Sequence, residues 1–152
     1  RAPDVFRSLF NGQANAILVA RSLTVVDRGR VVELRPRGRR ERRVCQLVRV
    51  VNGDRTVLLA NFHATAHERA LARAEVERVG RAVAGAEASI VCGDFNVPKT
   101  GLPGFSSPIE GIDQILVRAL RFVRPPARWS KEQRRLDGRL LSDHAPVEAV
   151  VA

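Results

Sequence analysis

The apolar residues of this chain fall into short runs rich in β-branched side chains, bounded by polar residues or glycine. Such runs predict strands, and they recur from residue 15 almost to the end of the chain. The predicted strands span residues 15–20, 23–26, 31–34, 44–51, 56–62, 89–92, 111–117 and 145–151. Only residues 68–86 have helical spacing, with Ala72, Val76, Val79 and Val83 on one face. We therefore expect an α/β fold rich in sheet, with one clear helix.

Length and charge narrow the class of protein. The 152 residues fit one domain, and the formal net charge is +10. Of the 26 basic residues, 24 are Arg, whose planar fork suits phosphate; a GC-rich genome would produce the same excess. Cys45 and Cys92 lie inside apolar runs, as buried free thiols do, and form no disulfide framework. No run approaches the roughly 18 apolar residues of a membrane span, so we expect none. The sequence leaves the location unknown, with the cytoplasm as the favoured compartment.

Three segments are predicted to be loops. Residues 35–43 contain six Arg with Pro and Gly, as a solvated loop or a hairpin tip would, and contact with a phosphate backbone is the alternative. Residues 97–109 hold three Pro and two Gly. Residues 124–141 form a second basic region, in which Arg124, Arg128 and the only Trp, Trp129, are candidate substrate-binding residues.

Polar residues of catalytic type stand at the ends of the apolar runs. If the runs share a sheet, these residues could converge on one rim. Carboxylates can hold Mg²⁺ or activate water, and a histidine needs a carboxylate to fix its tautomer. Together they suit metal-assisted hydrolysis of a phosphate ester. The candidates are His63, Asp94, Asn96, Asp113, Asp143 and His144.

Several motifs resemble those of the endonuclease/exonuclease/phosphatase superfamily, the DNase-I-like metal-dependent phosphoesterases. Asn61-Phe62-His63 resembles its strand-end histidine motif, with Phe62 where Thr is more usual. The resemblance covers about residues 13–151, and the motifs follow in the expected order. The other matching segments are 15–21, 93–98 (Gly-Asp-Phe-Asn-Val-Pro), 112–115 (Ile-Asp-Gln-Ile) and 142–147 (Ser-Asp-His-Ala-Pro-Val).

The resemblance implies a layered α/β sandwich and a role for each candidate. Asp94 would orient or deprotonate the attacking water, and Asn96 would hold a phosphoryl oxygen. His144, held by Asp113, would contact the scissile phosphate. Asp143 would lie at or beside the metal, which would be Mg²⁺ or, with the same hard ligands, Mn²⁺. His63 would be a second phosphate-binding or acid-side imidazole.

One departure from the superfamily pattern concerns the metal site. The principal metal-binding Glu of the superfamily lies in a Gln-Glu motif upstream of the segment that residues 15–21 match. Residues 1–14 contain no such motif. We therefore expect an N-terminally incomplete domain that lacks its opening strands, with the missing segment present in the full protein.

Structural explanations compete with these roles. Asp94 and Asn96 could form an Asx turn, Asp143 and His144 a surface turn, and His63 could be a satisfied core imidazole. The preferred function is a nuclease that hydrolyses nucleic-acid phosphodiester bonds. The alternatives are a phosphatase of the same superfamily acting on lipid or inositol phosphates, and a catalytically inactive nucleic-acid-binding module.

Overall fold

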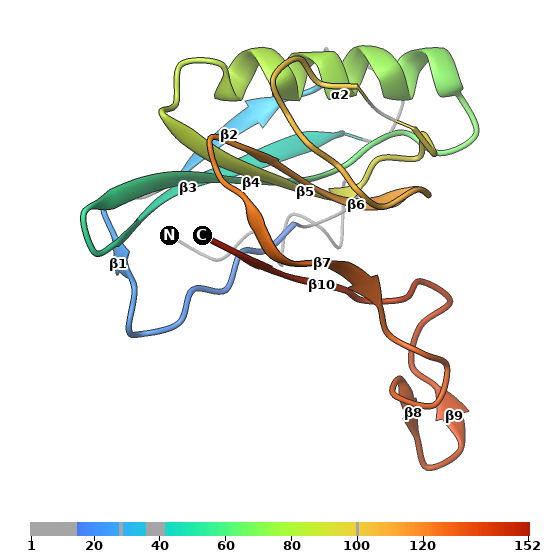
Figure 1. Ribbon diagram of the computed structural model, residues 1–152. Coiled ribbons are helices and arrows are strands. Elements are labelled where there is room, and N and C mark those ends of the chain that lie inside the picture. The colour runs from blue at the N-terminus through green and yellow to red at the C-terminus, as the bar shows by residue number, and fades with distance from the viewer. Residues whose placement is uncertain (1–14, 28, 36–41, 100) are drawn as a thin grey trace.

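A mixed sheet of six strands forms the centre of the computed structural model, which describes residues 15–27, 29–35, 42–99 and 101–152 (Figure 1). Two short strands pair one after the other with the outer edge of β3, and they are β1 (Thr24–Val25) and β2 (Arg30–Glu33). From that edge inward the order is β3 (Val44–Asn52), β4 (Arg55–His63), β5 (Ala88–Asp94) and β6 (Asp113–Arg118).

The connection from β4 to β5 runs through the helix α2 (Arg69–Val83) and makes these two strands parallel. Parallel strands end at the same edge of a sheet, so His63 at the end of β4 lies in register with Asp94 at the end of β5. β6 is antiparallel to β5 and begins at that edge, where Asp113 pairs with Asp94. The topology therefore places three candidate residues side by side.

One face of the sheet packs on α2 and forms the larger core (Figure 1). The apolar face predicted for the helix is buried as expected. Phe62, Val91 and Leu116 reach this core from β4, β5 and β6, and each is at most 1% exposed. Successive side chains of a strand point to opposite faces of the sheet. Because Phe62, Val91 and Leu116 face the helix, the side chains of His63, Asp94 and Asp113 lie on the face away from it.

The opposite face is covered by a second, smaller layer. β7 (Phe122–Arg128) and β10 (Val147–Val151) form an antiparallel pair on the side of the sheet away from α2 (Figure 1). Between the two layers lies an apolar cavity of about 720 Å³. Its walls include Val50, Leu59 and Ile90 of the sheet and Val151 of β10. The predicted layered α/β sandwich is confirmed.

Two predictions about secondary structure are wrong. Residues 15–20 alternate between half-buried and exposed positions as a strand would, but they belong to no strand. The alternation arises because Ile17 and Val19 pack on the second face of the sheet. Hydrogen bonds from side-chain amides, and not a backbone ladder, hold this segment in place. Asn15 Nδ2 donates to the carbonyl of Val44, and Asn61 Nδ2 donates to the carbonyl of Ala16, both at 2.9 Å.

The second error concerns residues 124–141, which were expected to be a loop. The segment begins inside β7, and further on it forms a small hairpin of β8 (Arg135–Leu136) and β9 (Arg139–Leu140). Pro125 and Pro126 predicted a loop because proline cannot donate to a ladder. They fall where the register of β7 on β10 shifts, so β7 contains them while residues on both sides of them, Arg124 and Ala127, pair with β10.

The remaining expectations concern cysteines, the Arg-rich loop and membrane crossing. Cys45 and Cys92 are free, and burial raises the pKa of their thiols to about 12 and about 11, so both are poor nucleophiles. Of the Arg-rich segment 35–43, residues 36–41 lie outside the described part. Within the described ranges, no helix has the length and apolar character that crossing a membrane requires.

Candidate active site

The turn after β5 explains the sequence Gly-Asp-Phe-Asn residue by residue. Gly93 has a φ of +142°, and a Cβ at this position would lie 1.9 Å from the carbonyl oxygen of Phe62. Only glycine lets the two backbones approach this closely. Phe95 is fully buried, and its ring meets the ring of Phe62 edge-on at a centroid distance of 4.7 Å. These two residues fix the path of the turn that carries Asp94 and Asn96.

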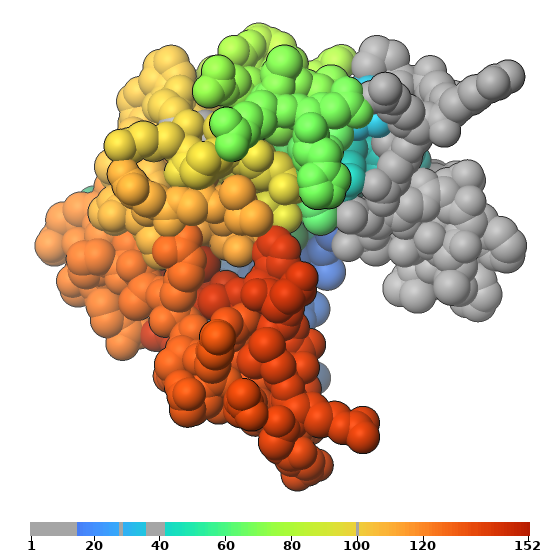
Figure 2. Space-filling view, turned by 90° about the vertical axis from the view of Figure 1, so that its right-hand side faces the viewer, coloured from blue at the N-terminus to red at the C-terminus, as the bar shows by residue number. Residues whose placement is uncertain are grey.

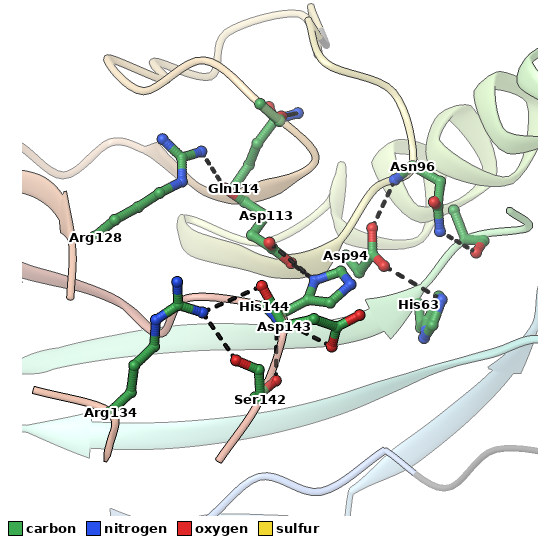
Figure 3. A network of polar contacts seen from close by, with 12 residues as sticks. His63, Asp94, Asn96, Asp113, Gln114, Arg128, Arg134, Ser142, Asp143 and His144 are labelled. Carbon is green, nitrogen blue, oxygen red and sulfur yellow. Dashed lines mark hydrogen bonds and ion pairs between the residues drawn. The ribbon is translucent and has the colours of Figure 1, made fainter. Parts of the chain in front are cut away.

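Asp94 and Asn96 form an Asx turn that also faces the neighbouring strand. The backbone N–H of Asn96 donates to Oδ1 of Asp94 at 2.9 Å, and Asn96 adopts a φ of +50°, which Asn tolerates. Oδ2 of Asp94 lies 3.4 Å from Nε2 of His63. The Asx turn and the catalytic placement are therefore compatible, because the turn uses Oδ1 of Asp94 and leaves Oδ2 facing His63 (Figure 3).

Asn96 uses its side chain as a clamp. Its Nδ2 donates to the carbonyl of Ala64 at 2.9 Å, and the N–H of Ala64 donates to the carbonyl of Asp94 at 2.8 Å. These bonds tie the segment after β4 to the turn after β5. The amide nitrogen of Asn96, which could have held a phosphoryl oxygen, is thus engaged with the backbone.

His144 reaches the site from the other layer. It lies in the loop before β10, and its Nδ1 is 2.9 and 3.0 Å from the two carboxylate oxygens of Asp113 on β6 (Figure 3). The hydrogen bond to Asp113 is the main cause that raises the pKa of His144, and the charges of Asp113, Asp94 and Asp143 act in the same direction. Burial opposes them. This carboxylate holds the ring in place with Nε2 directed away from Asp113.

Asp94, Asp113 and His144 form a cluster whose ligand-type atoms lie within 4.8 Å of one another. Two carboxylates beside an imidazole offer the hard donors that suit a divalent metal ion, and two adjacent carboxylates gain from a cation between them. His63 flanks the cluster next to Asp94. By its donor chemistry, the cluster fits a divalent metal ion, although the sequence assigned catalytic roles to its three members and the metal to Asp143.

Asp143, the predicted metal-binding residue, lies beside this cluster but is not part of it. It is exposed, and its Oδ1 accepts the N–H of His144 at 3.2 Å. Oγ of Ser142 accepts the same N–H at 3.1 Å. Arg134 donates to the carbonyls of Ser142 and Asp143 at 3.0 and 3.1 Å, so it fixes the loop from behind (Figure 3).

The three predicted substrate-binding residues make contacts within the protein. Arg124 forms an ion pair with Glu148, and Nε1 of Trp129 lies 3.4 Å from the other oxygen of that carboxylate. Arg128 donates to the carbonyls of Glu110 and Asp113, so it lies behind the carboxylate that holds His144. All three residues are exposed, but each has a structural contact to give up or share before it binds a phosphate.

Sequence reasoning missed a buried carboxylate that supports the site. Glu75 of α2 is fully buried; its Oε2 accepts the N–H of Thr65 at 2.7 Å, and its Oε1 accepts the Thr65 hydroxyl at 2.8 Å. Arg35 compensates the charge, with a nitrogen 3.4 Å from Oε1. Thr65 lies two residues after His63, so this network holds the segment that follows β4. The available signal was the place of Glu75 on the apolar face of the helix, between Ala72 and Val76.

A second missed residue holds the long loop. Gln114 on β6 is 2% exposed, and its side-chain nitrogen donates to the carbonyls of Val97 and Gly111, both at 2.7 Å. Gln114 is next to Asp113 in sequence and points to the helix side of the sheet. It therefore anchors the start and the end of the loop at residues 97–111 to the strand that carries the His144 partner.

Comparisons with known proteins agree with this geometry at the level of fold. No family model matches the chain, and no curated protein matches it in sequence. Solved structures do match, each over 86% of this chain. They include TDP2 of D. rerio complexed with a single-strand DNA product (TM-score 0.71, 15% identity, 68% of that chain), an endonuclease/exonuclease/phosphatase from Bacteroides vulgatus (0.68, 16%, 66%) and a mannosyl-6-phosphatase from Bacteroides thetaiotaomicron (0.62, 16%, 67%).

The matches cover most of this chain but only part of the other structures. The chain spans about two thirds of the length of these structures. At 15–17% identity the likeness concerns the arrangement of the backbone. With its mixed sheet and its second layer, this chain has the fold of the endonuclease/exonuclease/phosphatase superfamily.

Proposed function

We propose that this protein is a metal-dependent phosphodiesterase that hydrolyses phosphodiester bonds of nucleic acids. The observation that carries the proposal is the Asp113–His144 pair beside Asp94 and His63 at one edge of the sheet. Two carboxylates and two imidazoles within reach of one another supply a base, an acid and contacts for an anionic substrate. Solved structures with the same fold include proteins named as phosphatases and a protein bound to DNA.

His144 and Asp94 divide the chemistry. Since Asp113 raises the pKa of His144, the imidazolium persists closer to neutral pH and can donate from Nε2 to a phosphoryl oxygen. Oδ2 of Asp94 faces His63, and it can orient a water and accept its proton. His63, next to Asp94, is placed to bind the phosphate or to protonate the leaving oxygen.

The proposed cofactor is Mg²⁺, with Mn²⁺ as an alternative that accepts the same ligands. Asp94 and Asp113 would hold it, with Asp143 at the side of the site. When bound, the ion would neutralise charge on the phosphoryl group and polarise water.

Charge favours nucleic acid as the substrate. The protein carries 26 Lys and Arg against 16 Asp and Glu. Cationic side chains that neutralise phosphates release counterions from a nucleic acid, and this release strengthens binding. A phosphatase acting on a small phosphate ester, including a lipid or inositol phosphate, is the second candidate. The contacts of Arg124 and Trp129 with Glu148 favour this phosphatase, because they leave fewer cations free to bind a long substrate. An inactive nucleic-acid-binding module is the third.

One set of assays separates the three. Labelled DNA and RNA, and a small phosphomonoester, are incubated with the protein in Mg²⁺ or in EDTA at several salt concentrations. We expect cleavage of the polynucleotide that needs Mg²⁺ and falls steeply with salt. Asp94→Asn should abolish cleavage and retain binding, while Asp54→Asn, the same change at an exposed turn at the other end of β4, should retain both. Hydrolysis of the monoester alone would favour a phosphatase, and binding without turnover in the parent would favour the inactive module.

A further inference from the structure

The β8–β9 hairpin projects from the body of the protein (Figures 1 and 2), and Arg134 at its base contacts the loop that carries His144. Its turn residues Asp137 and Gly138 have φ values of +49° and +76°, the signs of a type I′ turn, whose twist matches that of paired strands. The hairpin is therefore a formed ribbon with a defined register.

Each face of the ribbon combines a cation with an apolar side chain. Arg135 lies opposite Leu140 and Leu136 opposite Arg139, and directly paired residues share a face. All four are exposed, with Leu136 at 61% and Leu140 at 43%. No other described element covers them, so each side of the ribbon presents one guanidinium group and one leucine side chain to solvent.

The cations of the ribbon are available for a partner. Unlike Arg124, neither Arg135 nor Arg139 forms an ion pair with an acidic side chain in the part of the chain that the structure describes. Among the described residues, the only acceptor for the Arg135 guanidinium is the carbonyl of Gly138 within the turn, at 3.1 Å. Phosphates would meet these two guanidinium groups without first displacing a carboxylate.

The base of the ribbon is fixed to the catalytic loop. The N–H of Leu141 donates to the carbonyl of Arg134 at 3.0 Å, which closes the ribbon at its base. The Arg134 guanidinium then holds the carbonyls of Ser142 and Asp143, which immediately precede His144. A ligand held by the ribbon is thereby held in a fixed relation to the site.

We propose that the β8–β9 hairpin enters a groove of double-stranded nucleic acid and holds the duplex against the active site. A two-stranded ribbon has the width that the major groove of B-DNA admits. Arg135 and Arg139 would contact phosphates on the two sides of the groove, and Leu136 and Leu140 would contact its floor or sugar edges. The assignment rests on the proposed nuclease function, which it narrows to a duplex substrate.

Binding in EDTA tests the assignment without requiring turnover. Fluorescence anisotropy with a labelled duplex is measured over a range of salt for the parent and for Arg135→Gln/Arg139→Gln. We expect about tenfold weaker binding near 0.1 M salt and a salt slope reduced by about 1.8, the value for two lost phosphate contacts. The control Arg78→Gln/Arg81→Gln removes the same charge from the outer face of α2 and should bind as the parent does.

A second variant distinguishes a groove from a merely charged surface. Leu136→Ser/Leu140→Ser should weaken duplex binding several-fold and leave the salt slope unchanged. The loss should be smaller for a single strand of the same length. Since all four side chains are exposed, the far-ultraviolet circular dichroism and melting temperature of each variant should match those of the parent.

Several outcomes would overturn the assignment. One is parental affinity and slope in Arg135→Gln/Arg139→Gln; another is equal losses in the hairpin and α2 variants; a third is unchanged duplex binding in the Leu variant. Binding of the ribbon to vesicles of phosphatidylcholine and phosphatidylserine, lost in the Leu variant while duplex binding persists, would assign it to a membrane surface. Failure of the nuclease proposal is a different result, the absence of Mg²⁺-dependent cleavage by the parent.

Discussion

Nδ1 of His144 lies 2.9 and 3.0 Å from the two oxygens of the Asp113 carboxylate, and this contact joins the loop before β10 to the six-stranded sheet. Asp113→Asn replaces the carboxylate by a neutral amide. We expect the pKa of His144 to fall, because the hydrogen bond to Asp113 is the main cause of its rise. Titration of the His144 ring by NMR, in EDTA, measures the change.

The same pair gives a pH dependence of stability. A pKa raised in the folded state stabilises the fold below the unfolded pKa of about 6.5, and the contribution disappears as pH rises through the folded value. The difference in unfolding free energy between the parent and Asp113→Asn should therefore be larger at pH 5.5 than at pH 9. An equal difference at both values would mean that the pair does not carry the shift.

Glu75→Ala removes the acceptor of the Thr65 N–H and leaves the Arg35 charge without its partner. We expect a loss of about 3 kcal/mol in unfolding free energy, as for other broken buried pairs. Urea denaturation measures it. Glu77→Ala, on the exposed side of the same helix, should change stability by no more than about 0.5 kcal/mol. Glu75→Gln keeps one acceptor and should lose less than Glu75→Ala; equal losses would argue against the hydrogen bonds as the cause.

Gly93→Ala places a methyl group 1.9 Å from the Phe62 carbonyl oxygen, a distance that no side-chain adjustment relieves. We expect more than about 3 kcal/mol of destabilisation, or failure to fold, from strain and the displaced β4–β5 ladder. Gly85→Ala is the matched control, since open space surrounds a Cβ there, and it should be neutral or stabilising by up to about 1 kcal/mol. Thermal melts of the two variants decide the matter.

Removal and restoration of the metal has a readout that needs no turnover. A ligand that binds the folded state raises the melting temperature by mass action. We expect Mg²⁺ or Mn²⁺, added after EDTA treatment, to raise it in the parent and in Asp54→Asn but not in Asp94→Asn. An equal shift in all three proteins would place the bound ion elsewhere on the molecule.

Periodicity and local motifs sufficed for the part of the fold that carries the site. Strands β3 and β4 follow from their apolar β-branched runs, and α2 follows from its apolar face. The Asx turn of Asp94 and Asn96 follows from their residue types, which form such turns readily after a strand. These signals are short-range, and short-range signals can be read from one sequence.

The parts that were not predicted depend on contacts between distant segments. Whether residues 15–20 pair in a ladder or pack across a sheet face is not encoded in their alternation, which is the same in both cases. The ion pair of Arg124 with Glu148 joins two strands whose register shifts at Pro125 and Pro126. Glu75 was missed because its partners come from other elements, and a charge on an apolar helix face reveals neither of them.

The placement of His144 in the loop before β10 has a consequence for how the candidate active site comes apart. Asp94 and Asp113 stand on the six-stranded sheet, while the imidazole depends on the seating of β7 and β10 across the apolar cavity. A partial opening that lifts the smaller layer would separate the pair while the larger core stays intact. On heating, the contact of His144 with Asp113 should accordingly be lost before the sheet structure, so that the integrity of the site reports on the docking of two layers and not on global unfolding.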